Sequence, residues 1–234
     1  MCVLVAVITA NCFGQGQGRD ILEATAGVGS YRGTLSFSYI HNWRFGNNER
    51  IGIGAGARLT SFLGSNLYYI TAPAILTSGS RSPLILFKEN IVENIDSVLI
   101  GSPQVNSLNV CVNLEYRFSR KLTAGFNIDA IGFSLGKTKR ANYINGSEGR
   151  MTHASPTPWN ILLISDNDRG SLNSEFYARY TISPVLAIKA GAQFLFTEYT
   201  TEAPVQQEPM ANDRFRNKAL LFALGLTFNP GSNE

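Results

Sequence analysis

The stretch 107-SLNVCVNLEYRF-118 decides the fold, because it interleaves two different kinds of sequence. One set of alternate positions is apolar: Leu108, Val110, Val112, Leu114, Tyr116 and Phe118. The other set is mostly polar and carries two charges: Asn109, Cys111, Asn113, Glu115 and Arg117. Successive side chains of a β-strand point to opposite faces, so each set occupies a face of its own. The architecture then depends on which face meets water and which meets an apolar surrounding.

The length allows one large all-β domain or two small ones, and the charge argues against a nucleic-acid partner. The chain has 234 residues, of which 44% are hydrophobic and 16% are charged, whereas about 25% charged residues are usual in a soluble domain. The net charge of +3 is small, and the sequence has no run of Lys and Arg that could track phosphates. No apolar run reaches the roughly 18 residues of a transmembrane helix.

The N-terminal segment 1–18, MCVLVAVITANCFGQGQG, predicts a secretory signal peptide. An apolar run is followed by small residues, and we expect cleavage between about Gly14 and Gly18. A buried first strand and a lipoprotein anchor at Cys12 are the alternatives. Once the signal peptide is removed, Cys111 is left without a disulfide partner.

Alternation of period two recurs along the chain and predicts eight strands within a barrel domain, 19–228. The predicted strands cover roughly 20–29, 33–44, 50–62, 107–118, 121–134, 171–181, 185–198 and 216–228. They are long for a soluble sheet, and a tilted strand that crosses a bilayer needs about 9–11 residues. From the second strand onward the connections alternate between short and long, as in outer-membrane barrels. The short first connection breaks this rule, and a slip of the alternation near Ile131 and Phe133 indicates a β-bulge.

The polar face is unlike the Lys- and Glu-rich exterior of a soluble barrel, because it combines Gly, Ser, Thr and Asn with isolated charges of both signs. These charges are Glu23, Arg44, Arg58, Glu115, Arg117, Asp129, Glu175, Arg179 and Lys189. Buried charges must be paired or hydrogen-bonded, so we expect them to form a structural polar network inside a narrow barrel.

The apolar face carries aromatic residues near the predicted strand ends, where a membrane protein places its interfacial belts. They are Trp43, Tyr116, Phe118, Tyr180, Phe196 and Phe228. The sequence therefore predicts an all-β, antiparallel transmembrane β-barrel of about eight strands with its apolar face toward lipid. A secreted soluble β-barrel or sandwich, with the two faces inverted, is the alternative.

The last predicted strand, 218-KALLFALGLTF-228, has alternate apolar residues and a final aromatic residue. In this strand and in its overall pattern the chain resembles the small outer-membrane β-barrel proteins of Gram-negative bacteria, of the eight-stranded OmpA/OmpX-like or porin-like type. The resemblance covers roughly 20–228 and leaves 229–234 as a short tail. It implies a bacterial outer-membrane location, contact with the lipid bilayer and lipopolysaccharide, and recognition by the barrel-assembly machinery. It also implies short periplasmic turns and long extracellular loops.

The sequence offers little catalytic chemistry. His41 lies on the predicted lipid face, and lipid A deacylases of similar architecture resemble it in placing a His and a Ser on a lipid-facing strand. Here the next position on the same face is Trp43. No metal-ligand or cofactor motif is present, and three loop acids are read as solvated or as weak cation ligands: Glu89, Glu93 and Asp96. We therefore expect no catalytic, cofactor or metal site.

The leading hypothesis is a non-enzymatic outer-membrane barrel with a structural or surface-interaction role through loops 63–105 and 135–170. The alternatives are a membrane-embedded lipid-modifying enzyme with His41 as its base, a narrow pore, and a soluble binding module. The loops contain apolar segments that either extend the strands beyond the membrane, bind a partner, or add two membrane strands to make ten. These segments are 83-PLILF-87, 98-VLI-100 and 159-WNILLI-164.

Overall fold

The computed structural model describes residues 18–79, 89–144, 150–163 and 167–230 of the chain. Its strands are β1 (Gly18–Gly29), β2 (Arg32–Phe45), β3 (Ile51–Gly64), β4 (Leu67–Thr71), β5 (Ser97–Ile100), β6 (Gln104–Arg117), β7 (Leu122–Leu135), β8 (Lys139–Tyr143), β9 (Met151–Pro156), β10 (Trp159–Ile161), β11 (Leu172–Thr181), β12 (Leu186–Thr201) and β13 (Arg214–Phe228). Short helical segments are η1 (Asn47–Glu49), α1 (Ala74–Thr77) and η3 (Val92–Asn94). None of these described helices combines the length and the apolar character needed to cross a membrane. The predicted signal peptide lies outside the described residues except for Gly18, as do the apolar segment 83–87 and most of the tail.

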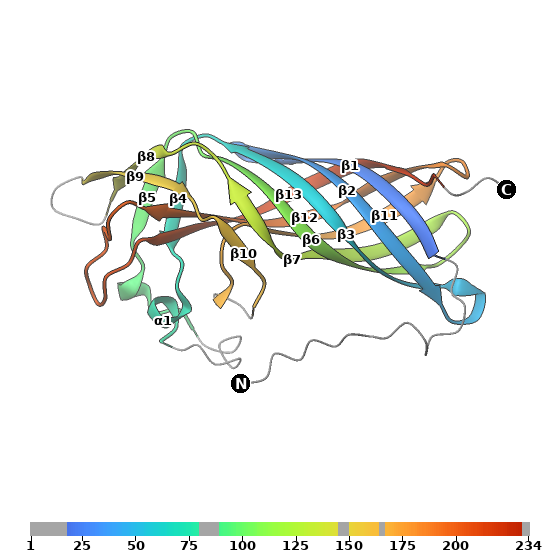
Figure 1. Ribbon diagram of the computed structural model, residues 1–234, viewed down its shortest axis with the longest axis horizontal. Coiled ribbons are helices and arrows are strands. Elements are labelled where there is room, and N and C mark those ends of the chain that lie inside the picture. Colours follow the sequence, from blue (N-terminus) through green and yellow to red (C-terminus); the bar gives the residue numbers. More distant parts are fainter. Residues whose placement is uncertain (1–17, 80–88, 145–149, 164–166, 231–234) are drawn as a thin grey trace.

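Eight of the described strands close into a ring in the order β1–β2–β3–β6–β7–β11–β12–β13, every neighbouring pair being antiparallel. β13 pairs back with β1, where Leu22 lies opposite Phe228, and this pairing completes the barrel (Figure 1). The predicted all-β antiparallel barrel of about eight strands is therefore confirmed. The predicted bulge is also present, because Val110 faces Ile131 whereas Cys111 faces Asp129. The apolar loop segments that are described lie outside this ring, so it does not have ten strands.

The apolar face of the strands is the outside of the barrel. On β6, the side chains from Leu108 to Tyr116 that share the apolar face are 38–49% exposed, whereas Asn109, Asn113 and Glu115 are 1–4% exposed. A soluble barrel requires the reverse arrangement, with its apolar side chains inside. The six predicted belt aromatics likewise point outward. Five of these belong to the end with the short turns, and Phe196 lies toward the opposite end.

A second, smaller ring continues the barrel at the end with the long connections. β13 pairs with β4, and the pairing then passes through β5, β8 and β9 and returns to β12, with Tyr199 opposite Pro156. Figure 1 shows β4, β5, β8 and β9 gathered at one end of the barrel. We call these four strands, together with the adjoining ends of β12 and β13, the head.

The short β1–β2 connection explains why the sheet narrows from eight strands to six. The two residues Ser30 and Tyr31 join β1 to β2, and Tyr31 adopts a φ of 59° in this tight turn. The chain after β3 then bends over this hairpin, where the backbone N–H of Ser65 donates to the carbonyl oxygen of Tyr31 at 2.9 Å. β4 thereby reaches β13. On the other side, β11 begins only at Leu172, and β9 occupies the place beside β12.

The head has an apolar interior, in contrast to the polar interior of the barrel. Its buried side chains include Tyr69, Val98, Ile100, Ala141, Tyr143, Ala154, Tyr199 and Phe215. The rings of Tyr69 and Tyr199 meet edge to face with centroids 5.2 Å apart. The Tyr199 hydroxyl both donates to the carbonyl and accepts from the N–H of Gln104, at 2.9 Å each. Apolar packing therefore covers the end of the polar lumen that lies toward the long connections.

Candidate functional site

The structure places eight of the nine predicted charges inside the barrel, with 0–6% of each residue exposed. These are Glu23, Arg44, Arg58, Glu115, Asp129, Glu175, Arg179 and Lys189. Every one of them lies in an ion pair with another member of the set. The four carboxylates match the four cations in number, so the buried set carries no net charge.

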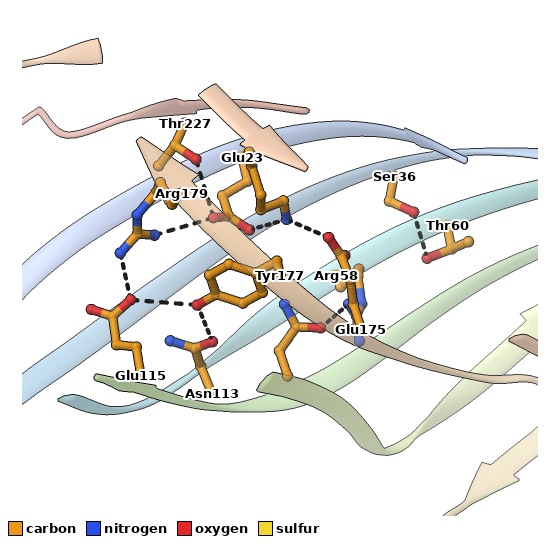
Figure 2. A network of polar contacts seen from close by, with 12 residues as sticks. Glu23, Ser36, Arg58, Thr60, Asn113, Glu115, Glu175, Tyr177, Arg179 and Thr227 are labelled. Carbon is orange, nitrogen blue, oxygen red and sulfur yellow. Dashed lines mark hydrogen bonds and ion pairs between the residues drawn. The ribbon is translucent and has the colours of Figure 1, made fainter. Parts of the chain in front are cut away.

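Glu115 is the centre of the first part of this network. One carboxylate oxygen accepts a hydrogen bond from Nη2 of Arg44 at 2.6 Å, and the other accepts one from Nη2 of Arg179. Tyr177 reaches the same carboxylate, with its hydroxyl 3.4 Å from Oε2, and donates to Oδ1 of Asn113 at 2.8 Å (Figure 2). Side chains from β2, β6 and β11 are thereby joined across the lumen.

Glu23 continues the network to the opposite wall. Its carboxylate lies 3.4 Å from Nη1 of Arg179 and 2.7 Å from Nζ of Lys189. Lys189 in turn lies 3.1 Å from Oε1 of Glu175, and Thr227 donates to Glu23 at 3.3 Å. An unbroken series of ion pairs therefore crosses the barrel from Arg44 on β2 to Glu175 on β11. Figure 2 shows the part of it from Glu115 to Glu175.

Arg58 forms a separate cluster nearer the head. Its Nε and Nη2 donate to Oδ1 of Asp129 at 2.9 and 2.6 Å. Nη1 donates to Oδ1 of Asn127 at 2.6 Å, and Nη2 also donates to the carbonyl of Asn173 at 2.7 Å. Asn109 donates to the second oxygen of Asp129 at 2.7 Å. A guanidinium held by this many acceptors has little freedom to bind anything else.

Small residues on the inner face make room for these long side chains. A Cβ atom added at Gly125 would lie 2.4 Å from atoms of the Tyr177 ring and 2.9 Å from the carbonyl oxygen of Leu114. A Cβ at Gly52 would lie 2.6 Å from the Glu115 side chain. Eight strands leave an interior just wide enough for side chains, and here the side chains fill it.

Arg117 is the exception among the predicted charges. It is only partly buried and lies where β6 ends, and its guanidinium donates to the backbone carbonyl of Asn48 in the neighbouring turn. The prediction that it joins the interior network is wrong. Alternation along a strand predicts on which face a side chain lies. It does not predict how far along the barrel axis the enclosed lumen extends, so it could not show that Arg117 lies at the open end.

His41 has a partner that the sequence reading missed. Nδ1 of His41 lies 2.7 Å from Oδ1 of Asp20, and the hydroxyl of Tyr39 donates to the same oxygen at 2.8 Å. The ring of Trp43 packs edge to face on the imidazole at 4.8 Å. A carboxylate that orients a histidine is half of a hydrolytic site. The residue across from His41 on β3 is Ala55, so that position supplies no hydroxyl or thiol.

A second buried ion cluster lies outside the lumen, below the head. Glu198 is fully buried. Its carboxylate accepts hydrogen bonds from Nε of Arg214 at 2.8 Å and from Nη2 of Arg216 at 2.9 Å. Both arginines also donate to the backbone carbonyl of Asp168. The cluster fastens the chain before β11 to the β12–β13 hairpin. No group of three potential metal ligands occurs among the residues that the structure describes, and Asp96, one of the three loop acids, accepts a hydrogen bond from Tyr143.

Several solved structures resemble the chain over nearly its full length. Neisserial surface protein A is 8% identical, with 90% of this chain and 94% of that chain covered and a TM-score of 0.35. The Yersinia pestis outer membrane protein Ail in a phospholipid bilayer nanodisc is 12% identical, with 92% and 99% covered and a TM-score of 0.38. Ail in complex with the heparin analogue sucrose octasulfate is 9% identical, with the same coverage and TM-score. No protein-family model and no curated protein matches the chain. These three similar solved structures are thus small outer-membrane barrels, as the sequence predicted. The assignment of the fold itself is based on the strand pairing described above.

Proposed function

We propose that the protein is a non-enzymatic barrel of the bacterial outer membrane, whose strands cross the bilayer and whose head presents a surface for interaction. The observation that carries this proposal is a closed ring of eight strands with an apolar exterior and a filled, charged interior. A closed ring pairs its backbone polar groups internally, which is the condition for crossing a membrane with strands. Water is a poor solvent for so large an exposed apolar surface.

The connections support one orientation of the barrel. The turns 46–50, 118–121 and 182–185 lie at one end with the start of β1 and the end of β13, whereas the long segments 65–103 and 136–171 lie at the other. In outer-membrane barrels the short turns face the periplasm and the long connections face outward. We therefore place the head on the cell surface, on the side of the leaflet that contains lipopolysaccharide. We further propose that β13 is the strand that the barrel-assembly machinery recognises.

The exterior of the head supports a role in surface interaction. Tyr68, Leu99, Asn142 and Met151 lie in one row across β4, β5, β8 and β9. Tyr68 is 57% and Met151 69% exposed. Contiguous exposed apolar area marks interaction surfaces, and Tyr68, Leu99 and Met151 contribute apolar area to this row. The predicted loops 63–105 and 135–170 supply this row.

Migration on an SDS gel tests the membrane barrel. The protein from an outer-membrane fraction is run unheated and boiled. We expect faster migration of the unheated sample, because a closed barrel in a detergent micelle resists SDS. Identical migration, together with recovery in the soluble periplasmic fraction, would contradict the proposal.

Cysteine labelling on intact cells tests the orientation. Met151→Cys in the head should react with a membrane-impermeant maleimide. Lys121→Cys, also at an exposed position but in the β6–β7 turn, should react only after the outer membrane is permeabilised. The native thiol of Cys111 is a suitable background because it is fully buried. Labelling of Lys121→Cys but not of Met151→Cys on intact cells would invert the orientation.

A further inference from the structure

A polar hollow lies between two turns at the end of the barrel opposite the head. The β2–β3 and β6–β7 turns are neighbours because β3 pairs with β6, with Ile51 opposite Tyr116. The hollow has a volume of about 680 Å³. Its lining residues are Asn48, Glu49, Arg50, Arg117, Phe118, Ser119 and Arg120.

Three guanidinium groups and one carboxylate line this hollow. Arg50 and Arg120 are exposed, and neither forms an ion pair with a described residue. The guanidinium of Arg117 is held at the rim by the Asn48 carbonyl, and its backbone N–H donates to the carbonyl of Arg50 at 2.7 Å. The hydrogen bond between the two backbones fixes the turns relative to each other, so the arginines converge on one space.

Glu49 offsets little of this positive charge. Its carboxylate lies 3.8 Å from Nη2 of Arg19, which is outside the hollow. The lining therefore carries three cations against one anion that already has a cationic neighbour. A site with this balance favours an anionic ligand, and guanidinium groups suit phosphate oxygens because they can donate two parallel hydrogen bonds.

The hollow adjoins the apolar exterior of the barrel. Phe118 lines it and is 58% exposed, and its ring packs edge to face on that of Tyr116 with centroids 4.9 Å apart. Tyr116 belongs to the outward apolar face of β6. A ligand in the hollow thus has cations on one side and the beginning of the apolar belt on the other, which is the arrangement that a phospholipid headgroup with its acyl chains requires.

We propose that this hollow binds the phosphate of an anionic phospholipid in the leaflet that the short turns face, with Arg50, Arg117 and Arg120 around the phosphate and the acyl chains along Phe118 and Tyr116. The inference rests on the proposed membrane location of the barrel. It adds a lipid site on the side away from the head, which the proposed surface role does not use.

Native mass spectrometry of the protein in a non-ionic detergent, titrated with phosphatidylglycerol, tests the site. The double variant Arg50→Gln/Arg120→Gln should bind this lipid about tenfold more weakly, as expected for the loss of charge-assisted hydrogen bonds. Arg140→Gln/Arg150→Gln removes the same number of charges from the head and should bind as the unaltered protein does. Equal binding by Arg50→Gln/Arg120→Gln and the unaltered protein would overturn the proposal.

Two further arms separate the possible ligands and the possible failures. Glycerol 1-phosphate should compete only weakly, because it lacks acyl chains; competition as strong as that of the lipid would show a site for free phosphate and overturn the lipid assignment. Each sample is also run unheated and boiled on an SDS gel. A heat-modifiable barrel without lipid preference would sink this inference alone, whereas a protein that is not heat-modifiable would sink the membrane proposal itself.

Discussion

Glu115 illustrates, at the scale of one residue, how the barrel holds charge away from water. Its carboxylate contacts two guanidinium groups and lies beside an amide and a hydroxyl. Removing one partner from a buried pair leaves the other charge uncompensated, which costs about 3–5 kcal/mol. We expect Glu115→Gln to lower the free energy of unfolding in urea by about 3 kcal/mol or more, since both Arg44 and Arg179 lose their main counter-charge.

An exposed ion pair provides the control for this prediction. Glu202 lies 3.7 Å from Nδ1 of His153, with both side chains more than half exposed. Surface substitutions of this kind usually change stability by less than about 0.5 kcal/mol. If Glu115→Gln proved as mild as Glu202→Gln, the lumen would have to be hydrated enough to screen its charges.

Tyr143 in the head makes a pH-dependent prediction. Burial, together with donation of its hydroxyl to the Asp96 carboxylate, raises its pKa to about 12. Because the ordinary value is about 10, the folded head keeps a proton between these pH values that the unfolded chain releases. Stability therefore falls as the pH rises from 10 to about 12. The absorbance difference at tyrosinate wavelengths between the unaltered protein and Tyr143→Phe should titrate near pH 12; a midpoint near pH 10 would refute this.

At the scale of the strand, β6 could be predicted from sequence because its two faces differ completely in polarity. The same contrast located the other seven barrel strands and the side chains that fill the lumen. It failed for the depth of Arg117, as alternation carries no information along the barrel axis. Asp20 was missed as the partner of His41, although the two lie opposite each other once the β1–β2 register is set.

The strands of the head could not be predicted in the same way. β4, β5, β8 and β9 have only 4–6 residues each, too few for a clear period. Their partners also lie far away in the chain, as when β4 pairs with β13. The one signal in the sequence was the short connection between the first two strands, which broke the alternation of short and long connections. This short turn allows β4 to pass over the β1–β2 hairpin and pair with β13.

The joint between barrel and head depends on Asn217 of β13. Its side-chain Oδ1 accepts a hydrogen bond from Nη1 of Arg32 at 2.7 Å, and its Nδ2 donates to the backbone carbonyl of Tyr68 on β4 at 2.7 Å. Asn217→Leu should loosen β4 by about 1–3 kcal/mol, the cost of leaving buried polar groups unpaired. Trypsin should then cut the head faster, at Lys139 or Arg140, while the barrel stays heat-modifiable. Asn142→Leu, on the exposed face of β8, should leave the cleavage rate unchanged.

At the scale of the whole molecule, two successive barriers oppose the passage of ions. The ion-pair series fills the barrel, and the apolar interior of the head covers its outer end. An ion that entered would have to displace paired charges and then pass among largely apolar side chains, whose few hydroxyl groups are already hydrogen-bonded. We expect planar bilayers that contain the protein to show no discrete conductance steps in concentrated KCl. Regular steps from a sample shown to be homogeneous would revive the narrow-pore alternative.

The β12–β13 hairpin belongs to both rings, and this sharing has a consequence for biogenesis. β13 pairs with β12 along nearly its whole length, with β1 in the barrel and with β4 in the head. Among the described strands it is also the last in chain order. A nascent chain that stops before Arg214 therefore has open strand edges in both rings at once, and such edges invite pairing with other chains. Closure of the barrel and completion of the head therefore become a single late event, and in the proposed orientation a head at the cell surface implies a barrel already closed beneath it.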